Sequence, residues 1–233
     1  MSITDTIGEE ILMKRNCSLD EISDGKLYGV DDLVEANCNG CKGAAACCHR
    51  MGKSIILDPF DIYRLRLNLN LTFEKLLADK IELNVVDGII LPNLKMTGLY
   101  ESCVFLNKEG KCSIHANRPG ICRIFPLGRY YENHGFKYFL QINECNHNSK
   151  TMKKVSKWID TPDYKENEQF IIDWHYFLND IEEIIKKIQD ENQIKNINMF
   201  LLNTFYIKAY DTATDFYTQF NKRLAGIRNV IGE

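Results

Sequence analysis

The chain has 233 residues, 45% of them hydrophobic, and a formal net charge of −3. This length provides for one large domain or for a domain with an appendage, and the composition allows a proper hydrophobic core. The near-neutral charge does not suggest a surface for nucleic acid, although it leaves room for a local basic patch. No segment approaches the roughly 18 uninterrupted apolar residues of a membrane span, so we expect no membrane contact.

Nine cysteines are unevenly distributed along the chain. Residues 1–10 lack the basic and apolar regions of a secretory signal peptide, so we expect a cytoplasmic protein whose thiols stay reduced. There a high cysteine content favours metal or redox chemistry over a disulfide framework. Cys17 stands alone, the other eight lie between residues 38 and 145, and none follows Cys145. This distribution predicts an N-terminal segment (residues 1–37), a cysteine-cluster metal-binding domain (residues 38–150) and a helical C-terminal region packed on it (residues 151–233).

The first group of cysteines is Cys38, Cys41, Cys47 and Cys48, which glycine and alanine separate. A Cys-x2-Cys turn points two sulfurs at one centre, and the small residues leave room for the backbone to wrap an ion or a cluster. Adjacent side chains diverge in helices and strands, so we expect Cys47 and Cys48 to point apart. Either this pair serves two centres, or one member is a packing thiol.

Two helices and three hairpins are predicted after the first cysteines. The first helix begins with Asp58 at the N-cap, Pro59 at N1 and an acidic residue at N3. An Asp-Gly pair between two apolar runs is typical of a type I′ turn. The expected elements are helices from residue 58 and from Thr72, hairpins over residues 81–94, 103–112 and 129–141, and a short helix or tight turn over residues 117–123. The second hairpin would place Cys103 and Cys112 at facing strand ends.

The C-terminal region is predicted to be mainly helical. Apolar residues recur every three or four positions from Phe170 to Ile188, after a helix start at Thr161-Pro162, and again from Phe216 to Ile231. Residues 199–207 are apolar and aromatic; the length of this stretch does not distinguish a strand from a helix, and we favour a strand. We therefore expect an α+β fold, in which a small irregular cysteine-rich core of hairpins and short helices packs with C-terminal helices.

The eight cysteines between residues 38 and 145 form the candidate metal site. Eight thiolates supply two four-ligand centres, or one cluster and spare thiols. Thiolates select zinc, Cu(I) or iron–sulfur clusters, and both zinc and [4Fe–4S] accept four of them. His49 and His147 are further candidates for a mixed site. The predicted metal ligands are Cys38, Cys41, Cys47, Cys48, Cys103, Cys112, Cys122 and Cys145.

Two arginines, Arg118 and Arg123, flank Cys122. A cluster with four thiolates is anionic, so nearby guanidinium groups would stabilise it or hold an anionic substrate group. Both arginines are therefore candidate cofactor-binding residues. The alternative is that they form ordinary surface salt bridges.

Four sequence motifs occur in a characteristic order: Cys38-x2-Cys41-x5-Cys47-Cys48, Cys103-Val104-Phe105-Leu106, Gly110-Lys111-Cys112-Ser113-Ile114 and Arg118-Pro119-x2-Cys122-Arg123-x-Phe125-Pro126. Together they resemble the CxxCxxCC (YkgJ-type) cysteine-cluster family of zinc- or iron-chelating domains, over about residues 38–145. Five residues separate Cys41 from the cysteine pair, where the family name has two.

This resemblance implies a metal centre more firmly than a reaction. The family includes flagellin lysine N-methylases, whose cysteine domain is associated with an iron–sulfur cluster and S-adenosylmethionine. The first hypothesis is therefore an iron–sulfur protein with a [4Fe–4S] cluster and redox or protein lysine N-methyl-transfer chemistry. The second is a zinc-stabilised module that binds a protein partner. An open cleft beside the metal would favour an enzyme, and a closed metal site with an exposed apolar patch would favour the module.

Overall fold

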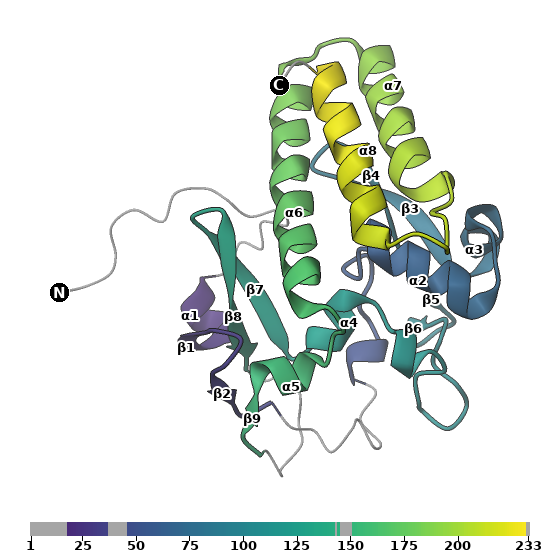
Figure 1. Cartoon of the computed structure of the whole chain (residues 1–233). Coiled ribbons are helices and arrows are strands. Elements are labelled where there is room, and N and C mark those ends of the chain that lie inside the picture. The colour runs from purple at the N-terminus through teal and green to yellow at the C-terminus, as the bar shows by residue number, and fades with distance from the viewer. Residues whose placement is uncertain (1–17, 37–45, 143, 145–150, 232–233) are drawn as a thin grey trace.

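The computed structural model describes residues 18–36, 46–142, 144 and 151–231. Helices and small antiparallel sheets confirm the α+β fold (Figure 1). The helices are α1 (Leu19–Ile22), α2 (Pro59–Leu69), α3 (Phe73–Asp79), α4 (Gly120–Ile124), α5 (Val155–Ile159), α6 (Tyr164–Lys187), α7 (Glu191–Leu202) and α8 (Phe216–Ile231). Shorter helical turns are η2 (Ala46–Cys48), η3 (His115–Asn117) and the π-helical η4 (Asn203–Ile207).

The strands form one sheet of three strands and three pairs, all antiparallel. The largest sheet has the order β1-β8-β7, and the pairs are β2-β9, β3-β4 and β5-β6. The strands are β1 (Ser23–Tyr28), β2 (Leu33–Val34), β3 (Ile81–Val86), β4 (Ile89–Leu94), β5 (Met96–Thr97), β6 (Ser102–Cys103), β7 (Leu127–Glu132), β8 (Gly135–Gln141) and β9 (Lys153–Lys154).

The predicted start of α2 is confirmed by a capping box. Asp58 Oδ1 accepts a hydrogen bond from the Asp61 backbone N–H (2.8 Å), and Asp61 Oδ2 accepts one from the Asp58 N–H (3.3 Å). Each carboxylate thus satisfies a backbone donor that the helix start leaves without an intrahelical partner. The Thr72 hydroxyl caps α3, at the start that the sequence predicted, by accepting a hydrogen bond from the Lys75 N–H at 3.4 Å.

The β3-β4 hairpin also follows the prediction, since Asp87 and Gly88 both have positive φ, +50° and +82°. A type I′ turn needs this backbone at its two central residues. The buried Asn198 of α7 clamps the hairpin: its Oδ1 accepts from the Ile90 N–H (2.6 Å), and its Nδ2 donates to the Gly88 carbonyl (3.0 Å). One side chain therefore fixes α7 to β4.

The strand predicted over residues 199–207 is wrong, because α7 and η4 occupy this stretch. Its buried residues, Leu201, Leu202, Phe205 and Tyr206, follow the spacing of one helical face rather than strand alternation. A residue of α8 holds the end of this helical segment. The Arg223 guanidinium donates to the carbonyls of Thr204, Lys208 and Ala209 at 2.6–2.8 Å.

The hairpin predicted over residues 103–112 exists only as a tight turn. Cys112 pairs with Leu106 in an isolated bridge, whereas Cys103 pairs with Met96 of β5. The Asn107 side chain accepts hydrogen bonds from two backbone N–H groups of the turn and tightens it. The two cysteines are therefore not at facing strand ends.

The largest hydrophobic core lies between α2, the β3-β4 hairpin and the C-terminal helices. Figure 1 shows α6, α8 and α7 side by side, with α2 below them and the β7-β8 hairpin beside α6. Cys103 is buried in this core, and Cys48, Cys112 and Cys122 pack against it. A second core lies between the largest sheet and α5, and its members include Val34, Ile124, Leu127, Tyr138, Val155 and Ile159.

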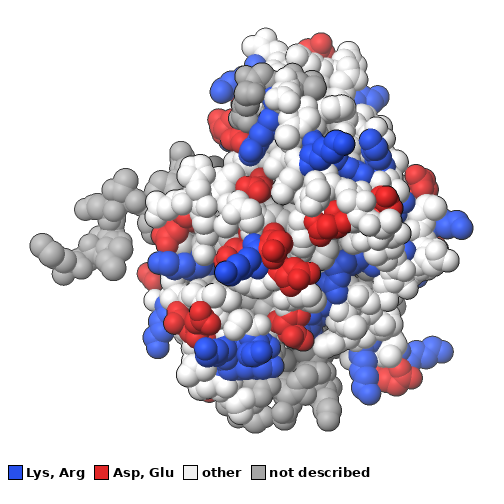
Figure 2. Space-filling view, in the orientation of Figure 1, with Lys and Arg blue, Asp and Glu red and all other residues white. Residues whose placement is uncertain are grey.

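The surface carries both signs of charge. Lysine and arginine are mixed with aspartate and glutamate over the face drawn in Figure 2, which agrees with the small net charge of the chain. As for the membrane, no helix in the described ranges combines the length and the apolar character that crossing a bilayer requires.

His175 of α6 gives the fold a dependence on pH. Its ring stacks on Tyr131 at a centroid distance of 3.5 Å and is buried. Burial, and then the positive charge of Arg129, lower the pKa of His175 to about 4. The folded protein therefore keeps this imidazole neutral at a pH where the unfolded chain, with a histidine pKa near 6.5, takes up a proton.

We expect this histidine to reduce stability as the pH falls from about 6.5 towards 4, by at most ~1.4 kcal/mol per pH unit. His175→Phe keeps an aromatic ring against Tyr131 but cannot be protonated. Urea titrations of both proteins at several pH values should show the variant gaining stability relative to the wild type as the pH falls. A constant difference across this range would contradict the assignment.

Candidate metal centre

Five of the eight predicted metal ligands lie in the described residues, and they come from four segments of the chain. Cys47 and Cys48 lie on η2, Cys103 on β6, Cys112 at the bridge to Leu106, and Cys122 on α4. No disulfide joins these five. The predicted ligands Cys38, Cys41 and Cys145, together with Cys17 and His147, lie outside the described residues.

Contacts between η2 and β6 place the cysteine pair beside Cys103. His49 forms an isolated bridge with Ser102, and its Nδ1 lies 2.9 Å from the Ser102 hydroxyl. The Arg50 N–H donates to the Glu101 carbonyl at 2.9 Å. Because Nδ1 of His49 is engaged by this hydroxyl, Nε2 is the nitrogen through which His49 could bind a metal.

Two further contacts bring in Cys112 and Cys122. The N–H and the hydroxyl of Ser113 both donate to the Phe105 carbonyl (2.8 and 3.0 Å), which holds Cys112 next to the segment that follows Cys103. The Gly120 N–H, at the start of α4, donates to Asp61 Oδ1 at 2.8 Å. This bond ties the helix that carries Cys122 to the start of α2.

The expectation that Cys47 and Cys48 point apart is wrong, since their Sγ atoms are 4.0 Å apart. Their Cα–Cβ bonds diverge, but rotation about χ1 turns both sulfurs to the same side. A tetrahedral zinc with Zn–S bonds of about 2.3 Å separates its sulfurs by roughly 3.8 Å. Both sulfurs can therefore bind one metal centre.

The described thiols influence one another's ionisation. The pKa of Cys48 is raised by its hydrogen bond with Cys47, then by burial and by the charges of neighbouring cysteines that include Cys103 and Cys112. Burial comes first in raising the pKa of Cys122, followed by the charge of Asp61 and by three of the other cysteines. Burial is also the first cause of the raised pKa values of Cys103 and Cys112.

This electrostatic coupling fits a site for a cation. Without a metal, the cluster favours neutral thiols, because each thiolate would oppose the next in a buried place. A soft metal ion reverses that balance, since a coordinated thiol is deprotonated outright. Within the described residues no three cysteine, histidine or acidic side chains come close enough to hold an ion. A complete coordination sphere therefore needs ligands from elsewhere in the chain or a closer approach of these thiols.

The two predicted cofactor-binding arginines have different surroundings. One Arg118 nitrogen lies 2.7 Å from His115 Nε2, and the Arg118 charge partly opposes the rise that burial causes in the pKa of Cys112. Arg123 is buried and donates to the carbonyls of Ala116 (2.6 Å) and Asp160 (3.2 Å). Burial, and then two neighbouring arginines, lower the pKa of Arg123 to about 10. The charge of Arg118 thus reaches a thiol, whereas the polar contacts of Arg123 connect η3 to the end of α5.

Beneath α4 lies a buried polar group that the sequence analysis missed. Burial raises the pKa of Asp61 to about 6 and, with the charge of Asp61, holds the pKa of Asp58 well above its ordinary value. Their carboxylates line a cavity of about 10 Å³, the size of one water molecule, together with the guanidinium of Arg129. The i, i+3 spacing of the two aspartates was visible as a helix cap, but nothing in the sequence indicated that Arg129 would be buried beside them.

The cysteine-bearing part of the chain matches a known family. The family model described as "CxxCxxCC: Putative zinc- or iron-chelating domain" matches residues 37–157, more than half of the chain, and this range includes all eight predicted ligands. No curated protein and no solved structure matches the chain. The motif order and the match agree, and they support metal binding by the cysteine-bearing part. The chain belongs to the CxxCxxCC family of zinc- or iron-chelating domains.

Proposed function

We propose that the central cysteines hold an iron–sulfur cluster of the [4Fe–4S] type, and that the protein acts in the cytoplasm in redox or protein lysine N-methyl-transfer chemistry. The observation that carries this proposal is that thiols from four segments gather at the main core: Cys103 lies in it, and Cys48, Cys112 and Cys122 pack against it. The Cys47 sulfur lies 4.0 Å from that of Cys48. S-adenosylmethionine as methyl donor and a protein substrate belong to the proposal through the family resemblance. Such a cluster would supply electron transfer.

Zinc and a [4Fe–4S] cluster each take four thiolates, so the number of cysteines bears on how many centres there are. Five thiols in the described part and three more cysteines in the family match provide for a second centre. The cluster is favoured over zinc by the family resemblance and by a neighbouring arginine. The positive charge of Arg118 near Cys112 would stabilise the anionic thiolates, because a guanidinium group favours the charged form of a neighbouring thiol.

A second candidate function is a zinc-stabilised module that binds a protein partner. The specific observation behind it is the turn between β5 and β6, where Leu99 is 100% and Tyr100 is 74% exposed. Two large apolar side chains at the tip of a turn are typical of a contact surface. This turn leads directly into Cys103, so metal binding would hold it in place.

Anaerobic purification followed by metal and acid-labile sulfide analysis tests the proposal. We expect a coloured protein that contains both iron and sulfide. A colourless protein with stoichiometric zinc and no sulfide would overturn the cluster and favour the zinc module. A metal-free protein whose thermal stability equals that of the metal-loaded form would overturn both, because a metal that binds only the folded state must raise stability.

A further inference from the structure

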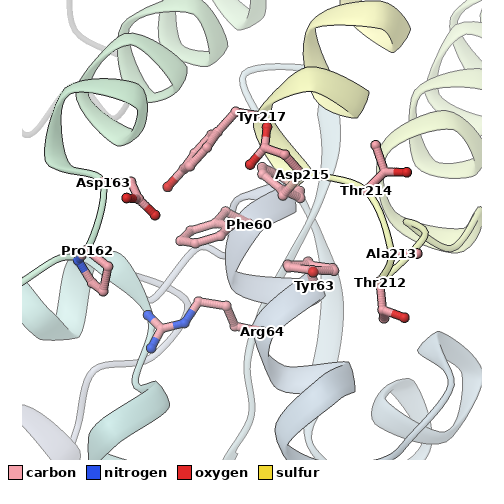
Figure 3. A pocket seen from close by; sticks show the side chains of 11 residues that line it. Phe60, Tyr63, Arg64, Pro162, Asp163, Thr212, Ala213, Thr214, Asp215 and Tyr217 are labelled. Atoms are coloured by element: carbon pink, nitrogen blue, oxygen red, sulfur yellow. The ribbon is translucent and has the colours of Figure 1, made fainter.

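A pocket lined by no cysteine opens between α2, the start of α6 and the segment that leads into α8 (Figure 3). Its volume is about 340 Å³, at the lower end of the range for small-molecule sites. One wall is aromatic, with ring centroids 4.9 Å apart for Phe60 and Phe216, 5.1 Å for Tyr63 and Phe216, and 5.3 Å for Phe60 and Tyr217. The four rings thus form one continuous surface from two helices.

Two carboxylates lie at this pocket. Asp163 precedes α6 with a left-handed backbone, and within the described residues its side chain has no hydrogen bond or ion pair. Asp215 Oδ2 caps α8 by accepting from the Thr218 N–H at 2.7 Å, which leaves the other oxygen for a ligand. Burial raises the pKa of Tyr217 to about 12; a hydrogen bond with Asn167 opposes this rise, and the charges of Asp58, Asp163 and Asp215 add to it. Figure 3 shows the hydroxyl end of Tyr217 directed towards Asp163.

Arg64 is the third charged residue of the pocket lining, and its guanidinium binds other groups. Its guanidinium donates to the Ala116 carbonyl (2.9 Å) and to Asn117 Oδ1 (3.2 Å), and Figure 3 shows it turned away from Tyr63. Its central carbon lies 5.7 Å from the centroid of the Phe60 ring. The donors of Arg64 are thus used by neutral oxygens, its positive charge stays beside Phe60, and the two carboxylates outnumber it in the pocket lining.

We propose that the pocket binds an organic ammonium ion, with its charge near Asp163 and Asp215 and its alkyl groups on the aromatic wall. Aromatic faces attract a cation through the ring quadrupole, and a carboxylate adds a direct Coulomb attraction. An anion of similar size would meet two negative charges, and a neutral molecule would gain only from apolar contact. This assignment is independent of the metal centre.

Choline is a suitable probe, because 3,3-dimethyl-1-butanol has nearly the same shape with carbon in place of the charged nitrogen. Calorimetric titration of the full-length protein should show choline binding roughly 2- to 30-fold more tightly than the neutral alcohol, as expected from the size of cation–π interactions. Added salt should weaken choline binding more than alcohol binding. Equal affinities for the two compounds, or no binding of choline, would overturn the proposal, as would preferential binding of inorganic phosphate.

Matched variants identify the groups responsible. Tyr63→Leu removes one ring of the wall and should weaken choline binding, whereas Tyr63→Phe keeps the ring and should retain it. Asp163→Asn should also weaken binding. Glu166→Gln removes an equal charge one turn further along α6, outside the pocket lining, and should have little effect. Circular dichroism checks that each variant is folded, and metal analysis of the same samples separates a failure here from a failure of the metal proposal.

Discussion

Serine in place of Cys103 or Cys122 is expected to remove most of the bound metal and to lower the free energy of unfolding by several kcal/mol. Each residue supplies a sulfur from a different segment, and no other cysteine lies on β6 or α4 to replace it. The binding free energy of a structural metal adds directly to the folding free energy. The measurement is metal stoichiometry and urea unfolding of anaerobically purified variants.

The matched control is Cys17→Ser, which removes a thiol that lies outside the family match. It should leave the metal content unchanged and cost only what local packing costs. Cys38→Ser and Cys41→Ser should lose metal, because the sequence pairs the two residues in one Cys-x2-Cys motif. Loss of metal in the Cys17 variant with full retention in the Cys38 and Cys41 variants would show that the ligand assignment is wrong.

The cysteine pair makes a separate test. With their sulfurs 4.0 Å apart, Cys47 and Cys48 can bind the same centre, so both single serine variants should lower metal content to a similar extent. If the two instead served different centres, the variants would lose different fractions of the metal. Native mass spectrometry distinguishes these outcomes, because it counts the metal atoms on each molecule.

Much of the fold could be predicted because its signals are local. The Asp58 cap, the Asp87-Gly88 turn and the apolar period of α6 each depend on a few neighbouring residues. The failures lie where two local interpretations compete. Residues 199–207 are apolar enough for a strand or a helix, and their buried side chains follow one helical face. Cys103 pairs with Met96, seven residues before it, whereas Cys112 pairs with Leu106.

At the metal centre, the motifs could be predicted from the sequence and the side-chain geometry could not. The spacing of the cysteines and their motif order were enough to name the family, and the ligand set drawn from them stays a prediction. The distance between the two sulfurs of the pair depends on side-chain torsions, which residue spacing does not determine. The packing of Asp58 and Asp61 against α4 depends on Gly120 and Arg129, which lie about 60 and about 70 residues further along the sequence.

Phe220→Ala in α8 is expected to lower the free energy of unfolding by roughly 3–5 kcal/mol. The Phe220 side chain is fully buried, and its ring contacts Phe170, Trp174, Phe205 and Phe216 with centroid distances of 4.6–6.2 Å. Removing the ring loses its apolar burial and leaves a cavity that the surrounding helical segments could fill only by shifting towards one another.

A matched control is Phe200→Ala in α7. Phe200 is 43% exposed on the outer face of the helix, so its truncation should cost well under half as much. This comparison also tests the helical assignment of residues 199–207, because a different backbone would redistribute which of these apolar side chains are buried. Urea unfolding gives both values, and metal analysis should show unchanged stoichiometry in each folded variant, since neither phenylalanine is a candidate ligand. Equal destabilisation by the two substitutions would contradict the arrangement of α7 and α8.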